Sequence, residues 1–247
     1  MQELARLPEE SLLSLCRKLA ALSGGRVAEN EAYETAASET GFFYSRYALR
    51  AAASADVIDR LLADAAQNGG PGLVGFTHEL AGAEWNAALE ARGFSRLAEQ
   101  AGMLLALESY IPREADASIR RIGREQLKEW SRVCEVSFPK PSEMPALRCW
   151  IGEPDCEFYA YMEEGRIIGT LLGYAAGGNY GIHEVATLPE RRGRGVCTAL
   201  LHHALASARR AGNRFASLQA SPAGAAVYER CGMRRVSTLS TWILPQG

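Results

Sequence analysis

One segment of the chain combines glycines, arginines and an apolar stripe: Glu184-Val-Ala-Thr-Leu-Pro-Glu-Arg-Arg-Gly-Arg-Gly-Val-Cys-Thr-Ala-Leu-Leu201. It reads as a strand, then a glycine-rich basic turn, then an apolar-striped helix that begins at Val196. Glycines permit a tight loop whose successive backbone N–H groups point into one concavity. The positive end of the helix dipole, with its unpaired N–H groups, points to the same place. The stretch therefore predicts a phosphate site, and a diphosphate fits it better than a single phosphate.

Three arginines, Arg191, Arg192 and Arg194, add positive charge to this loop. A basic loop is also compatible with a nucleic-acid patch. The sequence has neither the interleaved aromatic residues nor the excess of positive charge that such a patch requires. We therefore expect no nucleic-acid partner.

Length and composition indicate a folded globular protein. The chain has 247 residues, 47% of them hydrophobic and 23% charged, with a net charge of −2. This length suits two small domains better than one. No apolar run approaches a membrane span and the N-terminus lacks the order of a signal peptide, so we expect no membrane partner. The cysteines are scattered without metal-ligand spacing, which favours reduced thiols in a cytoplasmic protein: Cys16, Cys134, Cys149, Cys156, Cys197 and Cys231.

The pattern on either side of the loop predicts a mixed α/β fold. Before a linker at 109–117 we expect helices over 10–22, 54–66 and 83–91, and strands over 42–49, 73–77 and 103–107. After the linker we expect helices over 125–136, 196–210 and 222–230, with a helical turn at 146–151. Strands are expected over 119–122, 157–162, 166–174, 180–188, 215–219 and 236–244, and a proline-rich loop over 138–145.

Three features of the second half resemble a known family. Arg192-Gly-Arg-Gly-Val-Cys197 is similar to the Arg/Gln-x-x-Gly-x-Gly/Ala acyl-CoA motif of the Gcn5-related N-acetyltransferases. Thr187-Leu-Pro-Glu resembles the strand-end signature of that family, and Val227-Tyr-Glu-Arg-Cys-Gly-Met233 resembles its Tyr-Glu-x-x-Gly-Phe signature. The three occur in the family's order, each on the expected element. The resemblance implies an acetyltransferase fold over residues 118–247.

The first half carries a fainter copy of the same pattern. Val57 matches Val196, an offset of 139 residues. The same offset pairs Leu49 with Leu188, Leu61 with Leu200, Leu62 with Leu201, Ala65 with Ala204, Glu90 with Glu229 and Gly93 with Gly232. Element order and offset agree, so we expect two acyl-CoA N-acyltransferase-like domains in tandem, over 1–110 and 118–247.

The first copy differs where the chemistry would lie. In place of the basic loop it has Ala52-Ala-Ser-Ala-Asp56, without glycine or a cation, and in place of Tyr228 it has Leu89. A loop without glycine cannot easily wrap a diphosphate, and Asp56 would repel it. We therefore expect a degenerate, non-catalytic half. It would pack against the second half, shape the substrate cleft or form a homodimer surface.

The resemblance implies acetyl-CoA as the acyl donor. The backbone groups of Val185 and Thr187 would pair with the pantetheine arm. The residues expected to hold the cofactor are Val185, Ala186, Thr187, Arg191, Arg192, Gly193, Arg194, Gly195, Val196, Cys197, Thr198 and Ser221. Cys197 stands where the family has glycine or alanine. Ser221 replaces the asparagine of many relatives, and we expect it to cap the following helix.

Acyl transfer also requires an acid and a base. Tyr228 matches the family's general acid, although a tyrosine on a helix also serves simply to pack its ring on the sheet. His183 and Glu184 are both candidates for the base, and neighbouring strand residues face opposite sides, so we expect one of them in the cleft. A covalent route through Cys197 is the alternative to direct transfer, since a helix N-terminus lowers a thiol's pKa. We expect His202 and His203 at the surface or at the cofactor's edge, and no metal site.

These features predict an acetyl-CoA-dependent N-acetyltransferase whose acceptor is the primary amine of a small molecule or peptide. A non-catalytic acyl-CoA-binding or regulatory module is the alternative, and transfer to a hydroxyl differs only in the acceptor. The intact loop together with Tyr228 favours the enzyme.

Overall fold

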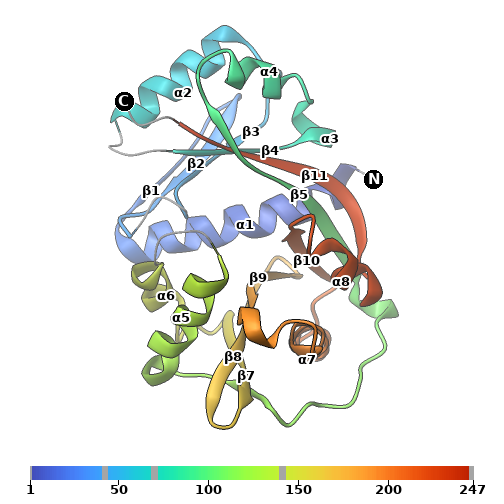
Figure 1. Cartoon of the computed structure of the whole chain (residues 1–247). Coiled ribbons are helices and arrows are strands. Elements are labelled where there is room, and N and C mark those ends of the chain that lie inside the picture. Colours follow the sequence, from blue (N-terminus) through green and yellow to red (C-terminus); the bar gives the residue numbers. More distant parts are fainter. Residues whose placement is uncertain (1, 41–43, 68–71, 139–142, 245–247) are drawn as a thin grey trace. The chain divides into compact units, whose positions relative to one another are not determined.

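The structure is a computed structural model that describes residues 2–40, 44–67, 72–138 and 143–244 (Figure 1). The chain divides into two compact units. The first contains Met1–Gly102 together with Val236–Gly247, and the second contains Met103–Arg235. Each unit is described by itself below. No helix in the described ranges is long and apolar enough to cross a membrane.

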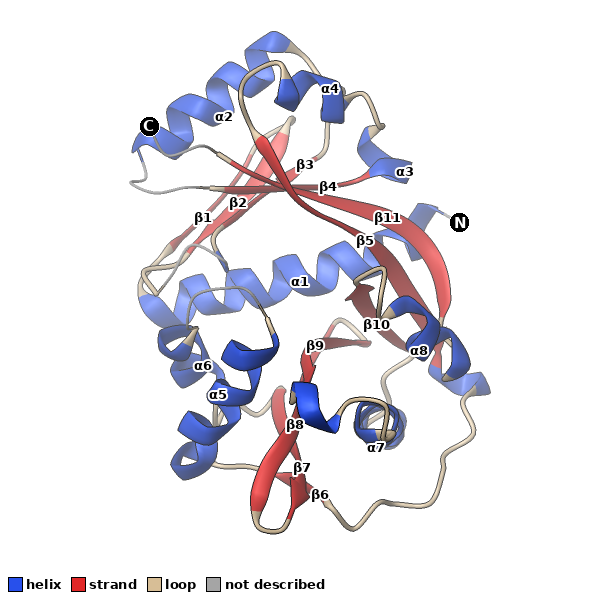
Figure 2. Ribbon diagram, viewed as in Figure 1, coloured by secondary structure: helices blue, strands red, loops and turns tan. Residues whose placement is uncertain are grey.

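The second unit holds the basic loop (Figure 2). Its helices are α5 (Leu127–Ser137), α6 (Met144–Trp150), α7 (Val196–Arg210) and α8 (Ala225–Arg230), with 3-10 turns η2 (Leu107–Ser109), η3 (Arg124–Gln126) and η4 (Pro189–Arg191). Its strands are the end of β5 (Ser95–Ala106), β6 (Ile119–Arg121), β7 (Cys156–Glu163), β8 (Arg166–Ala176), β9 (Asn179–Thr187) and β10 (Phe215–Ala220). The strand order is β5-β10-β9-β8-β7-β6. β6 to β9 pair antiparallel, and β9 pairs with β10 in parallel.

Helices α5 and α7 cover opposite faces of this sheet, and the alternation along β8 shows why. Thr170 lies against Cys134 of α5, with its Oγ1 3.4 Å from the cysteine sulfur. Its neighbour Gly169 faces α7, because a Cβ atom at Gly169 would lie 2.4 Å from the Val196 Cγ1 atom. Successive strand residues point to opposite faces, so Thr170 contacts α5 on one face and Gly169, which has no side chain, lets α7 pack closely on the other.

Gly169→Ala should destabilise the second unit by about 1–3 kcal/mol, because overpacking forces the first turn of α7 away from β8. Urea unfolding followed by circular dichroism measures the change. Adding Val196→Ala to this variant removes the methyl groups that would collide, so the double variant should recover part of the loss. An unchanged unfolding midpoint for Gly169→Ala would contradict the close approach of α7 to β8.

The first unit has the strand order β1-β2-β3-β4-β11-β5. Its strands are β1 (Arg26–Glu29), β2 (Tyr33–Ala37), β3 (Arg46–Leu49), β4 (Leu73–Thr77), most of β11 (Arg234–Ile243) and the beginning of β5. Its helices are α1 (Gln2–Ser23), α2 (Ala55–Gln67), α3 (His78–Ala81) and α4 (Trp85–Glu90). β1, β2 and β3 are antiparallel, β3 pairs with β4 in parallel, and β4 pairs with β11 antiparallel.

The two faces of this sheet differ in chemistry. On one face Tyr33, Phe76 and Trp242 join α2 and α4 in an apolar core. On the other face Glu34 and Thr77, the next residues along β2 and β4, contact α1. The period of two along each strand therefore separates an apolar layer from a charged one.

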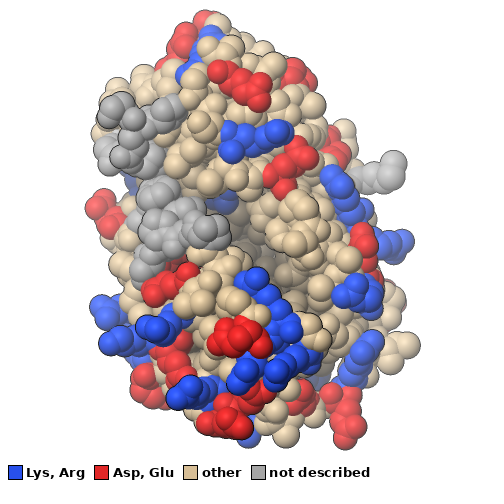
Figure 3. All heavy atoms as spheres, viewed as in Figure 1, with Lys and Arg blue, Asp and Glu red and all other residues tan. Residues whose placement is uncertain are grey.

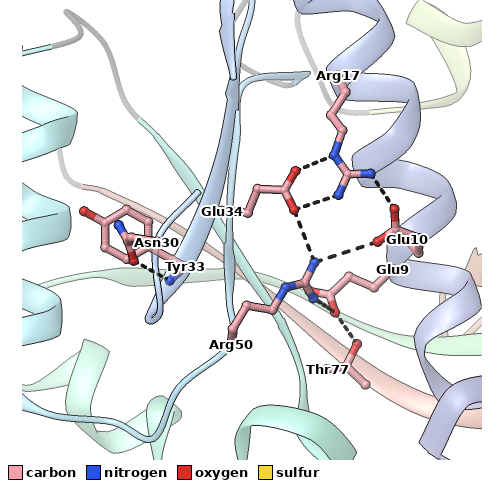
Figure 4. A network of polar contacts seen from close by, with 8 residues as sticks. All are labelled: Glu9, Glu10, Arg17, Asn30, Tyr33, Glu34, Arg50 and Thr77. Carbon is pink, nitrogen blue, oxygen red and sulfur yellow. Dashed lines mark hydrogen bonds and ion pairs between the residues drawn. The ribbon is translucent and has the colours of Figure 1, made fainter. Parts of the chain in front are cut away.

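The charged layer is a network of ion pairs between α1 and the strands (Figure 4). Arg17 donates to both oxygens of Glu34 and also to Glu10. The Arg50 guanidinium lies 3.2 Å from Glu9 and 3.7 Å from Glu34. Burial raises the pKa of the Glu9 carboxyl, while Arg50 and a hydrogen bond from Thr77 act in the opposite direction. Ion pairs that are this buried need their partners, so the network fixes how α1 lies on the sheet.

The compact units do not coincide with the expected ranges 1–110 and 118–247. Residues 236–247 group with the first unit, because β11 pairs with β4 from Leu239↔Thr77 to Ile243↔Leu73. Strand β5 is also longer than the 103–107 expected, so it passes from the first unit into the second before the segment 110–116, which has no regular structure.

Candidate active site

Strand β9 separates from β10 towards its end. The parallel pairing runs from Asn179↔Phe215 to Gly181↔Ser217, and in the described residues it stops there although both strands continue. The register of β9 with β8 shifts between Thr170 and Leu172, where β9 has an additional residue. Such a bulge bends its strand. The bulge therefore lies just beyond the point where the pairing of β9 with β10 ends.

The basic loop follows the end of β9. Gly193 and Gly195 have φ angles of +77° and +83°, in the left-handed region that favours glycine. Gly195 is the N-cap of α7 and no side chain caps the helix. The N–H groups of the first turn at Val196, Cys197 and Thr198 are consequently open to a ligand, at the positive end of the dipole. The arrangement can bind an anion without any further residue.

The three arginines of the loop differ in their contacts. Arg191 pairs with Glu163 at the end of β7, and the Arg192 Nε donates to the Thr187 carbonyl oxygen at 3.3 Å. Arg194 is exposed. In Figure 3, basic side chains with acidic ones among them gather over the part of this face where α7 begins in Figure 1. The positive potential of the loop therefore comes mainly from Arg192, Arg194 and the helix end.

The backbone of Thr187 is less open than expected. Its carbonyl accepts hydrogen bonds from the Ser137 hydroxyl at 3.2 Å and from Arg192 at 3.3 Å. A carbonyl oxygen has two lone pairs, so this group has no acceptor capacity left for a pantetheine arm. Thr187 pairs with Gly169, and Ala186 pairs with Thr170, on the opposite side of the strand.

Tyr228 and Cys197 lie near each other in the second unit. Burial of the Tyr228 ring raises the pKa of its hydroxyl, and the nearby thiols of Cys197 and Cys231 raise it further. Burial also raises the pKa of the Cys197 thiol to about 11. This direction is opposite to the one that a helix N-terminus favours, because desolvation disfavours the thiolate. Both groups are therefore protonated at neutral pH.

Cys197 should react slowly with iodoacetamide at pH 8. Its thiolate fraction at that pH is roughly a hundredfold below that of an ordinary thiol, because a pKa near 11 replaces one near 8.5. The alkylation rate should keep rising up to pH 10, whereas the rate of an exposed model thiol levels off above pH 9. Mass spectrometry of the peptide that contains Cys197 measures this alkylation rate. Rapid alkylation at pH 7 would contradict the assigned environment.

His183 and Glu184 lie at the bulge of β9. His183 is buried opposite Leu172, so it faces the side of the sheet that α5 covers. Glu184 is half-buried and has a φ of +50°, which is rare for a residue with a side chain. The additional residue of the bulge interrupts the period of two along β9 at this point.

Ser221 closes the turn before α8 and is not the N-cap that the sequence predicts, since that position belongs to Gly224. Its hydroxyl accepts the Gly224 N–H at 3.2 Å, and its carbonyl accepts the N–H groups of Gly224 and Ala225. These bonds close the turn before α8 and so place Tyr228 on the first turns of that helix.

His202 does not lie at the surface, which was one of the two positions expected for it. It is 8% exposed, and its Nδ1 lies 3.0 Å from the Tyr110 hydroxyl, which also donates to the His202 carbonyl. Burial lowers the pKa of this imidazole, and Arg113 lowers it further. Its neighbour His203 is half-buried against Tyr159, with the ring centroids 4.8 Å apart. The sequence alone did not reveal that the segment after β5 covers this part of α7.

A cavity of about 530 Å³ adjoins the loop. It runs beside α7 from Gly195 to Arg210 and is closed on its other side by Pro112–Asp116. No group of three or more metal-ligating side chains occurs among the residues described.

Residues of β8 and α5 also support the site, and sequence reasoning missed them. Gly169 and Thr170 interrupt the apolar run from Ile167 to Leu172. A glycine inside such a strand often marks the close approach of another element, here α7. Ser137, on α5, has no comparable signal.

Residues 124–233 match the model of the acetyltransferase (GNAT) family. Members of this family transfer an acyl group and use acetyl-CoA as the donor. None of the curated proteins matches the sequence.

Solved structures resemble the chain as a whole. A GCN5-related N-acetyltransferase from Kribbella flavida is 15% identical with a TM-score of 0.73, covering 96% of each chain. One from Sphaerobacter thermophilus is 15% identical with a TM-score of 0.61, over 98% of this chain and 93% of the other. A functionally unknown conserved protein from Staphylococcus epidermidis is 11% identical with a TM-score of 0.64, over 87% and 92%. At these identities the likeness shows the fold, a mixed α/β fold with a mixed sheet.

Proposed function

We propose that this protein transfers an acetyl group from acetyl-CoA directly to a primary amine of a small molecule or peptide. The observation that carries the proposal is the joint geometry of three parts of the second unit. Strand β9 leads into a glycine loop, the loop ends at an uncapped helix, and Tyr228 on α8 lies near that helix.

The loop and the cavity fit an acyl-CoA. The open N–H groups of Val196, Cys197 and Thr198 would bind the diphosphate together with Arg192 and Arg194. The cavity that begins at Gly195 is large enough for a substantial organic group attached to that diphosphate. A single inorganic phosphate would leave it empty, so the cavity favours a large phosphorylated donor.

Acetyl-CoA would supply the activated carbonyl, and the residues around it would donate a proton to the leaving sulfur and accept one from the amine. The raised pKa of Tyr228 keeps its hydroxyl protonated, so it can donate a hydrogen bond and then the proton to the departing sulfur. The protonated Cys197 is a poor nucleophile, which supports direct transfer over a covalent cysteine route. His183 and Glu184 are the two candidates for accepting the amine's proton, because both lie at the bulge of β9.

The first unit would be a degenerate copy of the second. Each unit has three antiparallel strands, a helix, and a strand parallel to the third: β1-β2-β3-α2-β4 and β7-β8-β9-α7-β10. Helix α4 of the first unit and helix α8 of the second end in the same way. Gly93 and Gly232 have φ angles of +78° and +91°, and the residue after each donates to Leu89 and Tyr228 respectively at 3.1 Å. Such shared detail supports an internal repeat.

The first copy would have only a structural role, because a side chain already occupies an N–H group at the start of its helix α2. The Ser54 hydroxyl accepts the Val57 N–H at 3.3 Å, so a side chain caps α2 where α7 has only Gly195. Asp56 adds a negative charge in that first turn. An anion would meet a capped and acidic helix end there.

Release of free thiol from acetyl-CoA over a panel of amines and alcohols tests the function. We expect one or more primary amines to raise release well above hydrolysis, and mass spectrometry should find the acetylated amine. Binding of acetyl-CoA without any amine-dependent release would favour the acyl-CoA-binding module. Acetylation of alcohols alone would move the reaction to hydroxyl acceptors.

A further inference from the structure

The bulge of β9 depends on an unusual backbone conformation. Glu184 has a φ of +50°, and the register with β8 shifts at this point. Residues with a side chain avoid this region because Cβ approaches the following carbonyl oxygen too closely. The conformation therefore needs a contact that holds it in place.

Thr170 supplies that contact from β8. Its hydroxyl donates to the Glu184 carbonyl oxygen at 2.9 Å, and the residue is fully buried. The Cys134 sulfur lies 3.4 Å from the same hydroxyl oxygen. The single proton of Thr170 is used on the carbonyl, so the Cys134 S–H is the donor in the second contact. Two successive hydrogen bonds thus connect Cys134 of α5, through Thr170, to the bulge of β9.

The consequence for β9 follows from the period of a strand. If Glu184 returned to extended backbone, the additional residue would be absorbed and the register would slip by one. A slip of one residue turns every following side chain to the other face. Val185 would change sides, and so would the segment that leads into the glycine loop. The opening between β9 and β10 beyond Gly181 depends on the same bend.

We propose that Thr170 is a positioning residue that holds the bulge of β9 open for the acyl-CoA. This inference rests on the proposed function, because it concerns the strand that would receive the donor's pantetheine arm. Thr170 contacts neither the donor nor the acceptor in this account. It acts through the carbonyl of Glu184.

Thr170→Val replaces the hydroxyl by a methyl group of similar size and leaves the Glu184 carbonyl without this donor. Coenzyme A should bind about tenfold more weakly by isothermal titration calorimetry, the size expected for one buried hydrogen bond. The KM for acetyl-CoA should rise more than kcat falls. Thr170→Ser keeps the hydroxyl and should restore binding to within about twofold of the unaltered protein.

Hydrogen-exchange mass spectrometry separates positioning from general loss of stability. Thr170→Val should raise exchange in peptides covering 182–188 and leave those of β10 unchanged. Ser217→Ala is the matched control. It removes a buried hydroxyl that accepts from Asn179 at 2.8 Å, at the closed end of the β9–β10 pair. Ser217→Ala should lower the melting temperature about as much as Thr170→Val does, but it should leave the affinity for coenzyme A unchanged.

The unaltered protein is titrated first. If it binds no coenzyme A, the proposed function fails, and the exchange data alone then judge the role of Thr170 at the bulge. If it binds and Thr170→Val binds equally well with normal exchange at 182–188, the positioning role is overturned. Equal loss of affinity in Thr170→Val and Ser217→Ala would also overturn it, since general destabilisation would then explain both.

Discussion

Tyr228→Phe should lower amine-dependent thiol release by about 10²- to 10³-fold while coenzyme A binding changes less than about twofold, as expected for loss of one general acid. The hydroxyl is buried, and burial raises its pKa, so it carries its proton throughout the neutral range. Phenylalanine fills the same space but cannot donate that proton to the sulfur. A loss in kcat with intact binding is the signature of an interaction made in the transition state.

Tyr180→Phe is the matched control for this variant. Tyr180 is also buried in the second unit, and its hydroxyl donates to Glu157 at 2.7 Å at the closed end of β9. Removing it should reduce stability and leave the turnover number within about threefold of the unaltered protein. Full turnover in Tyr228→Phe would assign the proton to another group. An equal loss of turnover in both variants would indicate a structural effect.

Gly195→Val should raise the dissociation constant of coenzyme A about 100-fold. A β-branched residue cannot adopt the φ of +83° at this N-cap without strain, so the loop must rearrange. The strain amounts to roughly 1–2 kcal/mol, and the misdirected N–H groups lose charge-assisted hydrogen bonds worth roughly as much again. Together these reach the free energy of a hundredfold change in affinity.

Gly212→Val controls for the strain itself. Gly212 follows the other end of α7, has a φ of +81°, and like Gly195 has open space where a Cβ would be. Both variants should lower the melting temperature by similar amounts, but only Gly195→Val should lose affinity. Isothermal titration with coenzyme A gives the comparison. Unchanged affinity in Gly195→Val would remove the loop from the proposed binding site.

The sequence was most informative where local rules dominate. Helix α7 has the predicted bounds from Val196 to Arg210, because Gly195 and Gly212 mark its ends and its apolar stripe has one period. The β7–β8 hairpin is also close to prediction. In these elements each residue's preference agrees with the fold.

The sequence was least informative where distant residues decide the structure. The left-handed conformation of Glu184 depends on Thr170 of another strand, so the residues next to Glu184 in the sequence do not predict it. Helix α1 begins at Gln2 rather than near residue 10, since Pro8 lies within its first turns and charged contacts with Glu34 and Arg50 secure it. Strand β2 (Tyr33–Ala37) gave little signal because its polar residues face those charges. Burial of His202 likewise follows from a contact with Tyr110.

A crystal structure with bound coenzyme A would locate both parts of the proposed site. We expect the diphosphate on the N–H groups of Val196, Cys197 and Thr198, and the sulfur within hydrogen-bond distance of the Tyr228 hydroxyl. A diphosphate bound elsewhere, or a sulfur beyond the reach of that hydroxyl, would contradict the proposed site.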